Sequence, residues 1–197
     1  LAEFPDDVIP TQQKLDFFYR SNVCEGRSAL MLGGGGVLGF LHVGVGSELH
    51  RQGLLPRVIS GSSAGSIVAA ALAAYTDEEM AELDLVGMMD SEDDGRKSVL
   101  WQWVSGMGSR LTAEDTEKLI AATIPDLTFG EAYAKTGRQV SITVAPAEPN
   151  QRSRLLNAVS SPNVYLRSAA MASCAIPGVF PAVMLKAKNE RGETQPY

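Results

Sequence analysis

The order of segments along the chain predicts an α/β fold built on a parallel sheet. Two short apolar stretches, residues 28–32 and 54–60, are each followed by a segment with helical character, residues 38–52 and 63–75. Short apolar runs bounded by glycine or polar turns are typical of buried parallel strands. A strand–helix–strand–helix order places such strands in one sheet, with the helices as right-handed crossovers.

Three helices are expected in the first part of the chain. Residues 11–19 form a short amphipathic pattern ahead of the first strand and lead into the core. In residues 38–52 apolar side chains recur at helical spacing, and Gly53 is positioned to end that helix as its C′ residue. Residues 63–75 are rich in alanine and apolar side chains, which predicts a buried helix.

The remaining elements follow from shorter signals. The acidic residues 77–94 predict a helix and a loop, and the alternation of polar and apolar residues over Gln139–Val144 predicts a half-buried strand. Further elements are a helix over residues 112–123 with Thr112 as its N-cap, a helix over 166–175 and a strand over 183–186.

Composition excludes several classes of function. The chain has 197 residues, 45% apolar and 20% charged, which suits one globular domain with a real core. Its net charge of −6, without a long basic run, argues against nucleic acid as a partner. No apolar run reaches the roughly 18 residues of a membrane span, and no signal peptide is visible, so a cytoplasmic or peripheral membrane location is expected. Cys24 and Cys174 lack metal-ligand spacing, so no metal site is expected.

A G-x-S-x-G motif follows the second strand. It consists of Gly61, Ser62, Ser63, Ala64 and Gly65, and it lies between the apolar strand and the alanine-rich helix. A serine at such a strand–turn–helix junction is held exposed above the sheet as a nucleophile, and the two glycines leave room for the turn. The Ala64 N–H, at the helix N-terminus, is a candidate oxyanion donor. The alternative interpretation is that Ser62 or Ser63 only caps the helix.

A glycine loop, residues 33–39, follows the first strand. Its G-x-G-x-x-G pattern also occurs in dinucleotide-binding sites, but that reading requires an acidic residue at the end of the second strand, where this chain has Ile59-Ser60-Gly61. A phosphate-binding P-loop would need a following lysine, which is absent. Consecutive glycines can direct several N–H groups at one oxyanion. Because both turns leave neighbouring parallel strands at the same edge, they are expected to face each other.

A serine nucleophile needs a general base, and the histidines do not supply one in the usual order. Both histidines, His42 and His50, precede Ser63, whereas an α/β-hydrolase triad has its histidine after the serine. His42 is expected to pack near the glycine loop, and His50 is expected to be solvated.

These segments together resemble the patatin-like phospholipases. The resemblance rests on the glycine loop, the Gly-Ser-Ser-Ala-Gly turn and residues 172–181, Ala-Ser-Cys-Ala-Ile-Pro-Gly-Val-Phe-Pro, and it covers residues 28–197. Residues 11–27 resemble the lead-in segment of the triacylglycerol-lipase branch of that family. The resemblance implies a lead-in segment over residues 1–27 and a catalytic domain over residues 28–197, with a three-layer, parallel-rich sheet flanked by helices.

The resemblance also implies a mechanism. The family uses a Ser–Asp dyad without a histidine, which makes Ser63 the nucleophile and assigns the oxyanion hole to the glycine loop and the residue after the serine: Gly34, Gly35, Gly36, Val37 and Ala64. The family's aspartate lies in a D-G-[AG] motif soon after a segment similar to residues 195–197, so the catalytic domain is expected to be incomplete at its C-terminus. Asp94-Gly95 follows the serine turn too soon, in an acidic stretch, to be accepted as this aspartate. Many members have an arginine where this chain has Leu38.

The function expected from the resemblance is hydrolysis of carboxylic esters in phospholipids or acylglycerols, through an acyl-enzyme. The implied partner is lipid at a membrane or lipid-droplet surface, with a further segment of the same protein completing the site. No cofactor or metal is implied. The alternative is a non-catalytic acyl-lipid-binding or regulatory module. Tryptophan and methionine side chains, Met88, Met89, Trp101, Trp103 and Met107, are candidates for a lid or acyl channel, or for ordinary core.

Overall fold

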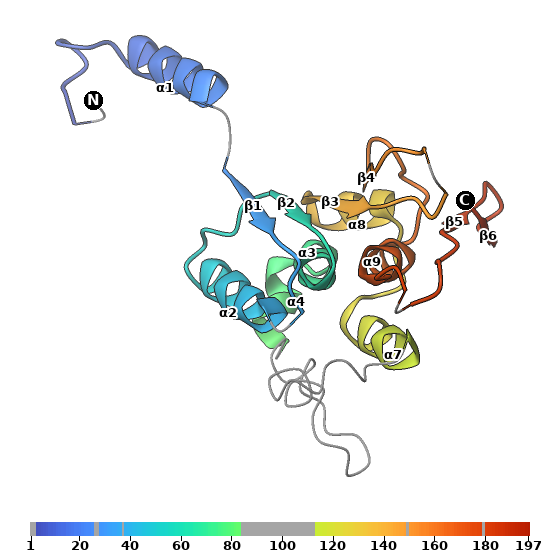
Figure 1. Cartoon of the computed structure of the whole chain (residues 1–197). Helices are drawn as coiled ribbons and strands as arrows, with labels where there is room; N and C mark the ends of the chain where they lie inside the picture. The colour runs from blue at the N-terminus through green and yellow to red at the C-terminus, as the bar shows by residue number, and fades with distance from the viewer. Residues whose placement is uncertain (1–2, 26–27, 37, 84–112, 149, 179) are drawn as a thin grey trace.

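The computed structural model describes residues 3–25, 28–36, 38–83, 113–148, 150–178 and 180–197 (Figure 1). Val37, residues 88–107 with their methionines and tryptophans, Asp94-Gly95 and Thr112 lie outside the described residues. The described elements, in chain order, are α1 (Thr11–Glu25), β1 (Ala29–Leu32), α2 (Leu38–Arg51), β2 (Val58–Gly61), α3 (Ala64–Ala74), α4 (Asp77–Glu82), α7 (Ala113–Thr123), α8 (Phe129–Thr136), β3 (Gln139–Val144), β4 (Arg154–Asn157), α9 (Leu166–Cys174), β5 (Lys186–Lys188) and β6 (Thr194–Pro196).

Four strands form the main sheet in the order β1-β2-β3-β4. The first three are parallel, which confirms the predicted parallel core of the sheet, and β4 adds an antiparallel edge. In the register, Leu32 lies beside Gly61, and Gly61 lies beside Ile142. The carboxyl ends of β1 and β2 therefore meet at one edge, so the glycine loop and the serine turn leave the sheet next to each other.

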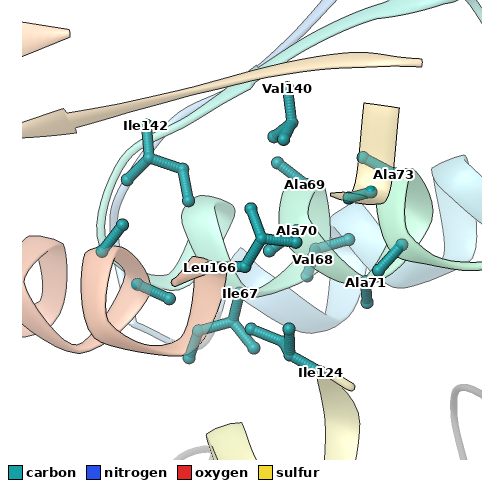
Figure 2. Close-up of a cluster of buried hydrophobic side chains, with 14 of the residues drawn as sticks. Ile67, Val68, Ala69, Ala70, Ala71, Ala73, Ile124, Val140, Ile142 and Leu166 are labelled. Atoms are coloured by element: carbon teal, nitrogen blue, oxygen red, sulfur yellow. The ribbon is translucent and has the colours of Figure 1, made fainter. Parts of the chain in front are cut away.

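Helix α3 is the centre of the core. All eleven of its residues are buried, as the alanine-rich sequence predicts. Figure 2 shows its side chains, from Ile67 to Ala73, between the strand residues Val140 and Ile142 on one side and Ile124, which follows α7, and Leu166 of α9 on the other. Small alanine side chains let the helix approach both the sheet and its neighbouring helices closely, and the larger apolar residues fill the remaining space.

Burial differs between the two faces of the sheet. Ile59, Val140 and Ile142 face the core and are buried, whereas Met31 and Leu155 are 80% and 51% exposed. Residues 28–32 therefore form a half-buried strand, not the fully buried strand predicted from their apolar composition. Alternate side chains of a strand point to opposite faces, so an apolar run alone does not show that both faces are covered.

Helix α1 differs from the prediction in length and in packing. It extends to Glu25 instead of ending near Tyr19, and Figure 1 shows it apart from the other elements. Its apolar side chains do not lead into the core, because Leu15, Phe17, Phe18 and Tyr19 are each at least half exposed. None of the described helices combines the length and the apolar character that crossing a membrane requires.

Three elements were not anticipated from the sequence: α8, β4 and β6, the last of which pairs with β5 in a second, two-stranded sheet. Helix α8 begins with a capping box, in which Thr128 and Glu131 each accept a hydrogen bond from the other's backbone N–H, and it ends at Gly137 in the left-handed region. Strand β4 pairs with β3 over only four residues. The expected strand at residues 183–186 lies slightly later, as β5.

Candidate active site

Ser63 has a strained backbone at the sharp turn between β2 and α3. Its φ of 50° and ψ of −126° lie in a region that residues with a side chain seldom adopt. The flanking glycines make the turn possible. A side chain on Gly61 would collide with the backbone of Gly65, and one on Gly65 would collide with the carbonyl oxygens of Leu32 and Gly33. The elbow geometry predicted from the motif is therefore present.

Helix capping does not account for this serine. Ser63 occupies the N-cap position of α3, but its side chain makes no capping hydrogen bond. The Ser63 carbonyl instead accepts hydrogen bonds from the Ser66 backbone N–H, at 2.8 Å, and from Ser66 Oγ, at 2.6 Å. The interpretation of Ser63 as a simple side-chain cap is therefore wrong.

The glycine loop lies against the elbow. A Cβ built on Gly34 would be 3.2 Å from Ser63 Cβ, and one on Gly39 would be 3.3 Å from Ala64 Cβ. Gly35 and Gly36 have φ values of 130° and 57°, which only glycine adopts readily. The structure therefore brings together the two segments that were singled out in the sequence.

A hydroxyl from a distant helix holds the backbone of the elbow. The Ser63 N–H donates a hydrogen bond of 2.9 Å to Ser173 Oγ, and Ser173 Oγ donates one of 2.7 Å to the Thr143 carbonyl. Ser173 lies within residues 172–181, which support the family resemblance, but its contact with Ser63 was not predicted. No local signal in the sequence pairs Ser173 with Ser63.

The two histidines lie in different surroundings. His42 Nε2 is 2.9 Å from the Gly33 carbonyl, and because a carbonyl oxygen only accepts, the nitrogen carries the proton. This agrees with the expected place of His42 near the loop. His50, which was expected to be solvated, keeps partial contact with solvent: its side chain is 18% exposed, and its Nε2 lies 3.1 Å from the Asp77 carbonyl and 3.3 Å from Asp77 Oδ1.

Cys174 lies next to the elbow but is not an activated thiol. Burial raises its pKa to about 11, although hydrogen bonds with the Ser66 and Ser63 side chains act in the opposite direction. The thiolate is the reactive form of cysteine, so this side chain is a protonated packing group near pH 7.

In the part of the chain that the structure describes, no aspartate, glutamate or histidine side chain hydrogen-bonds Ser63.

Comparisons with known proteins agree on one family. A family model described as patatin-like phospholipase matches residues 30–193. Triacylglycerol lipase 4 of Saccharomyces cerevisiae is 44% identical over 184 residues, which cover 87% of this chain and 20% of that protein. Triacylglycerol lipase 5 of the same yeast is 41% identical over 175 residues, covering 83% of this chain and 23% of that protein. The chain thus spans about a fifth of the length of these curated relatives.

Among solved structures, the chain is similar to the crystal structure of ExoU in complex with SpcU, from the type III secretion system of Pseudomonas aeruginosa. The TM-score is 0.47 at 23% sequence identity, and the match covers 78% of this chain and 39% of that chain.

Proposed function

The chain belongs to the patatin-like phospholipase family, and on that premise we propose that it supplies the nucleophile and the oxyanion site of a lipid acyl hydrolase. The observation that carries the proposal is the strained backbone of Ser63, with Gly34 of the glycine loop against it. An elbow of this kind presents a serine hydroxyl to a substrate, and the adjacent loop offers backbone N–H donors.

In the proposed reaction, Ser63 Oγ attacks the ester carbonyl and its proton passes to a general base. The carbonyl oxygen becomes an oxyanion, which N–H groups of Gly34, Gly35, Gly36 and Ala64 stabilise, with Val37 as a further donor on the strength of the resemblance. The base returns the proton to the leaving alcohol as the ester bond breaks. Water then attacks the acyl-enzyme, releases the fatty acid and restores the Ser63 hydroxyl.

We assign the general base to an aspartate that follows residue 197 in the full-length protein. The resemblance to the family supports this assignment, because the family's aspartate follows a segment similar to residues 195–197. The absence of a carboxylate hydrogen-bonded to Ser63 among the described residues is consistent with it.

The proposed substrates are phospholipids or acylglycerols at a membrane or lipid-droplet surface. The family description and the names of the yeast relatives support a lipid ester as the substrate class. The proposed reaction uses protein side chains, backbone N–H groups and water, so it needs no metal or organic cofactor. The proposed location is cytoplasmic or peripherally associated with a membrane.

The test is active-site labelling of the full-length protein with a fluorophosphonate, which reacts with activated serines. Ser63→Ala is expected to abolish labelling, whereas Ser62→Ala, a matched control at the neighbouring serine of the same turn, keeps it. Equal labelling of wild type and Ser63→Ala would refute the proposal. Lipid binding without labelling of the wild type would instead favour the non-catalytic module.

A further inference from the structure

We propose that Ser173 is a positioning residue that holds the backbone of Ser63 in its strained, reactive conformation. The inference deepens the proposed function and rests on it, because it concerns how the same nucleophile is kept in place. It assigns to Ser173 no contact with substrate. Ser173 acts through the Ser63 N–H, to which it is hydrogen-bonded at 2.9 Å.

The contact joins three elements at one point. Ser173 lies in the last turn of α9, Ser63 lies between β2 and α3, and Thr143 lies near the carboxyl end of β3. A hydroxyl has one proton to donate and lone pairs with which to accept. Because Ser173 Oγ donates its proton to the Thr143 carbonyl, at 2.7 Å, a lone pair is directed to the Ser63 N–H. The orientation of this hydroxyl is therefore determined on both sides.

The Ser63 N–H depends on a side-chain acceptor for its hydrogen bond. Strand pairing ends at Gly61, and Ser63 precedes the first residue of α3, so neither the sheet nor the helix satisfies its N–H. Neighbouring N–H groups of the turn do have backbone partners: Ser62 donates to the Leu32 carbonyl at 3.1 Å, and Gly65 donates to the Ser62 carbonyl at 3.0 Å. Ser173 supplies the missing bond at the residue with the positive φ.

This arrangement separates two kinds of N–H group at the site. The Ser63 N–H is occupied by Ser173 and serves to hold the nucleophile, whereas the proposed oxyanion donors belong to the glycine loop and to Ala64. Without the Ser173 hydroxyl, the Ser63 peptide is free to relax from its strained φ, which would move Oγ away from the attack position. A small displacement of a nucleophile costs rate more than it costs binding.

The experiment compares three variants of the full-length protein. Ser173→Ala removes the hydroxyl, and Ser173→Thr keeps it. Ser168→Ala is the matched control, because Ser168 is on the same helix and its Oγ also accepts a backbone N–H, that of Lys186 at 2.8 Å, but away from the elbow. The measurements are the rate of fluorophosphonate labelling, kcat and KM for p-nitrophenyl butyrate, the thermal midpoint, and hydrogen exchange at the Ser63 amide resolved by electron-transfer fragmentation.

For Ser173→Ala we expect labelling and kcat to fall about tenfold, with KM within about twofold of wild type. Exchange at the Ser63 amide is expected to accelerate. Ser173→Thr should recover most of the rate, and Ser168→Ala should match wild type in rate even where its thermal midpoint falls as much as that of Ser173→Ala.

The inference is overturned if Ser168→Ala loses as much rate as Ser173→Ala, or if the Ser63 amide exchanges equally slowly without the hydroxyl. A wild type that is not labelled would count against the proposed function instead. In that case amide exchange alone decides whether Ser173 holds the Ser63 backbone.

Discussion

Side chains from other elements hold the backbone groups of the candidate site. Ser173 of α9 accepts the Ser63 N–H, and His42 of α2 hydrogen-bonds the Gly33 carbonyl. The Gly33 carbonyl and the Gly34 N–H belong to one planar trans peptide, so they point in opposite directions. A hydrogen bond that orients the carbonyl therefore also orients the Gly34 N–H, one of the proposed oxyanion donors.

Replacing His42 is accordingly expected to impair the oxyanion site. His42→Ala should slow fluorophosphonate labelling of Ser63 by about tenfold, since one oriented donor is lost. His42→Gln keeps an N–H donor and should retain more of the rate. His50→Ala is the control, because its contacts are to Asp77 at the start of α4. If His42→Ala reacts at the wild-type rate, the hydrogen bond to Gly33 has no part in positioning the loop.

Among the elements, α3 leaves the least room for a larger side chain, at its first turn. Its first turn carries Gly65, which lies against the carbonyl oxygens of Leu32 and Gly33 at the end of β1. This close approach joins the elbow to the glycine loop. The sequence motif predicts the need for a small residue here, but the identity of the atoms that exclude a side chain depends on how β1 and α3 pack.

A methyl group at position 65 should therefore destabilise the whole fold. Gly65→Ala is expected to lower the free energy of unfolding by about 3 kcal/mol or more, because backbone atoms cannot move aside as a flexible side chain would. Urea denaturation followed by circular dichroism measures the change. Gly44→Ala, at an exposed position of α2 with open space around it, should instead raise stability by about 0.5–1 kcal/mol. Similar values for the two variants would contradict the packing described.

The elements were predictable to different degrees. The helix α2, the buried helix α3 and the strand β3 have strong local patterns, so their prediction was confirmed. Helix α8 was not predicted, although its capping signal Thr128-x-x-Glu131 and the glycine that ends it, Gly137, are present in the sequence. Strand β4 has no alternation of apolar and polar residues, because it is a short edge whose place depends on pairing with β3.

Across the whole molecule, the described chain has one buried core and, outside it, apolar side chains that are exposed to solvent. The core forms around α3, whereas α1 presents aromatic side chains such as Phe17 and Phe18 to solvent, and one face of the sheet exposes Met31. The division into a lead-in segment over residues 1–27 and a catalytic domain from residue 28 stays a prediction.

Amide hydrogen exchange should show the same difference between the buried helix α3 and the exposed helix α1. In the full-length protein, peptides from α3 are expected to exchange through global unfolding and to be the slowest, because every residue of α3 is buried. Peptides from α1 are expected to exchange orders of magnitude faster, since its apolar residues Leu15, Phe17, Phe18 and Tyr19 are at least half exposed. Mass spectrometry of timed samples makes the comparison. Equal protection of α1 and α3 would mean that another part of the protein covers α1.

The local features could be read from the amino-acid sequence: a parallel strand–helix order, a glycine loop, and a serine between glycines at a strand–helix junction. Such features depend on backbone freedom and side-chain spacing within a few residues, which a sequence displays directly. Three features became evident only in the folded chain: one face of β1 is exposed, α1 does not enter the core, and Ser173 hydrogen-bonds Ser63 from 110 residues away. Those outcomes depend on contacts between distant segments, and a hydroxyl that bridges them leaves no periodicity in the chain.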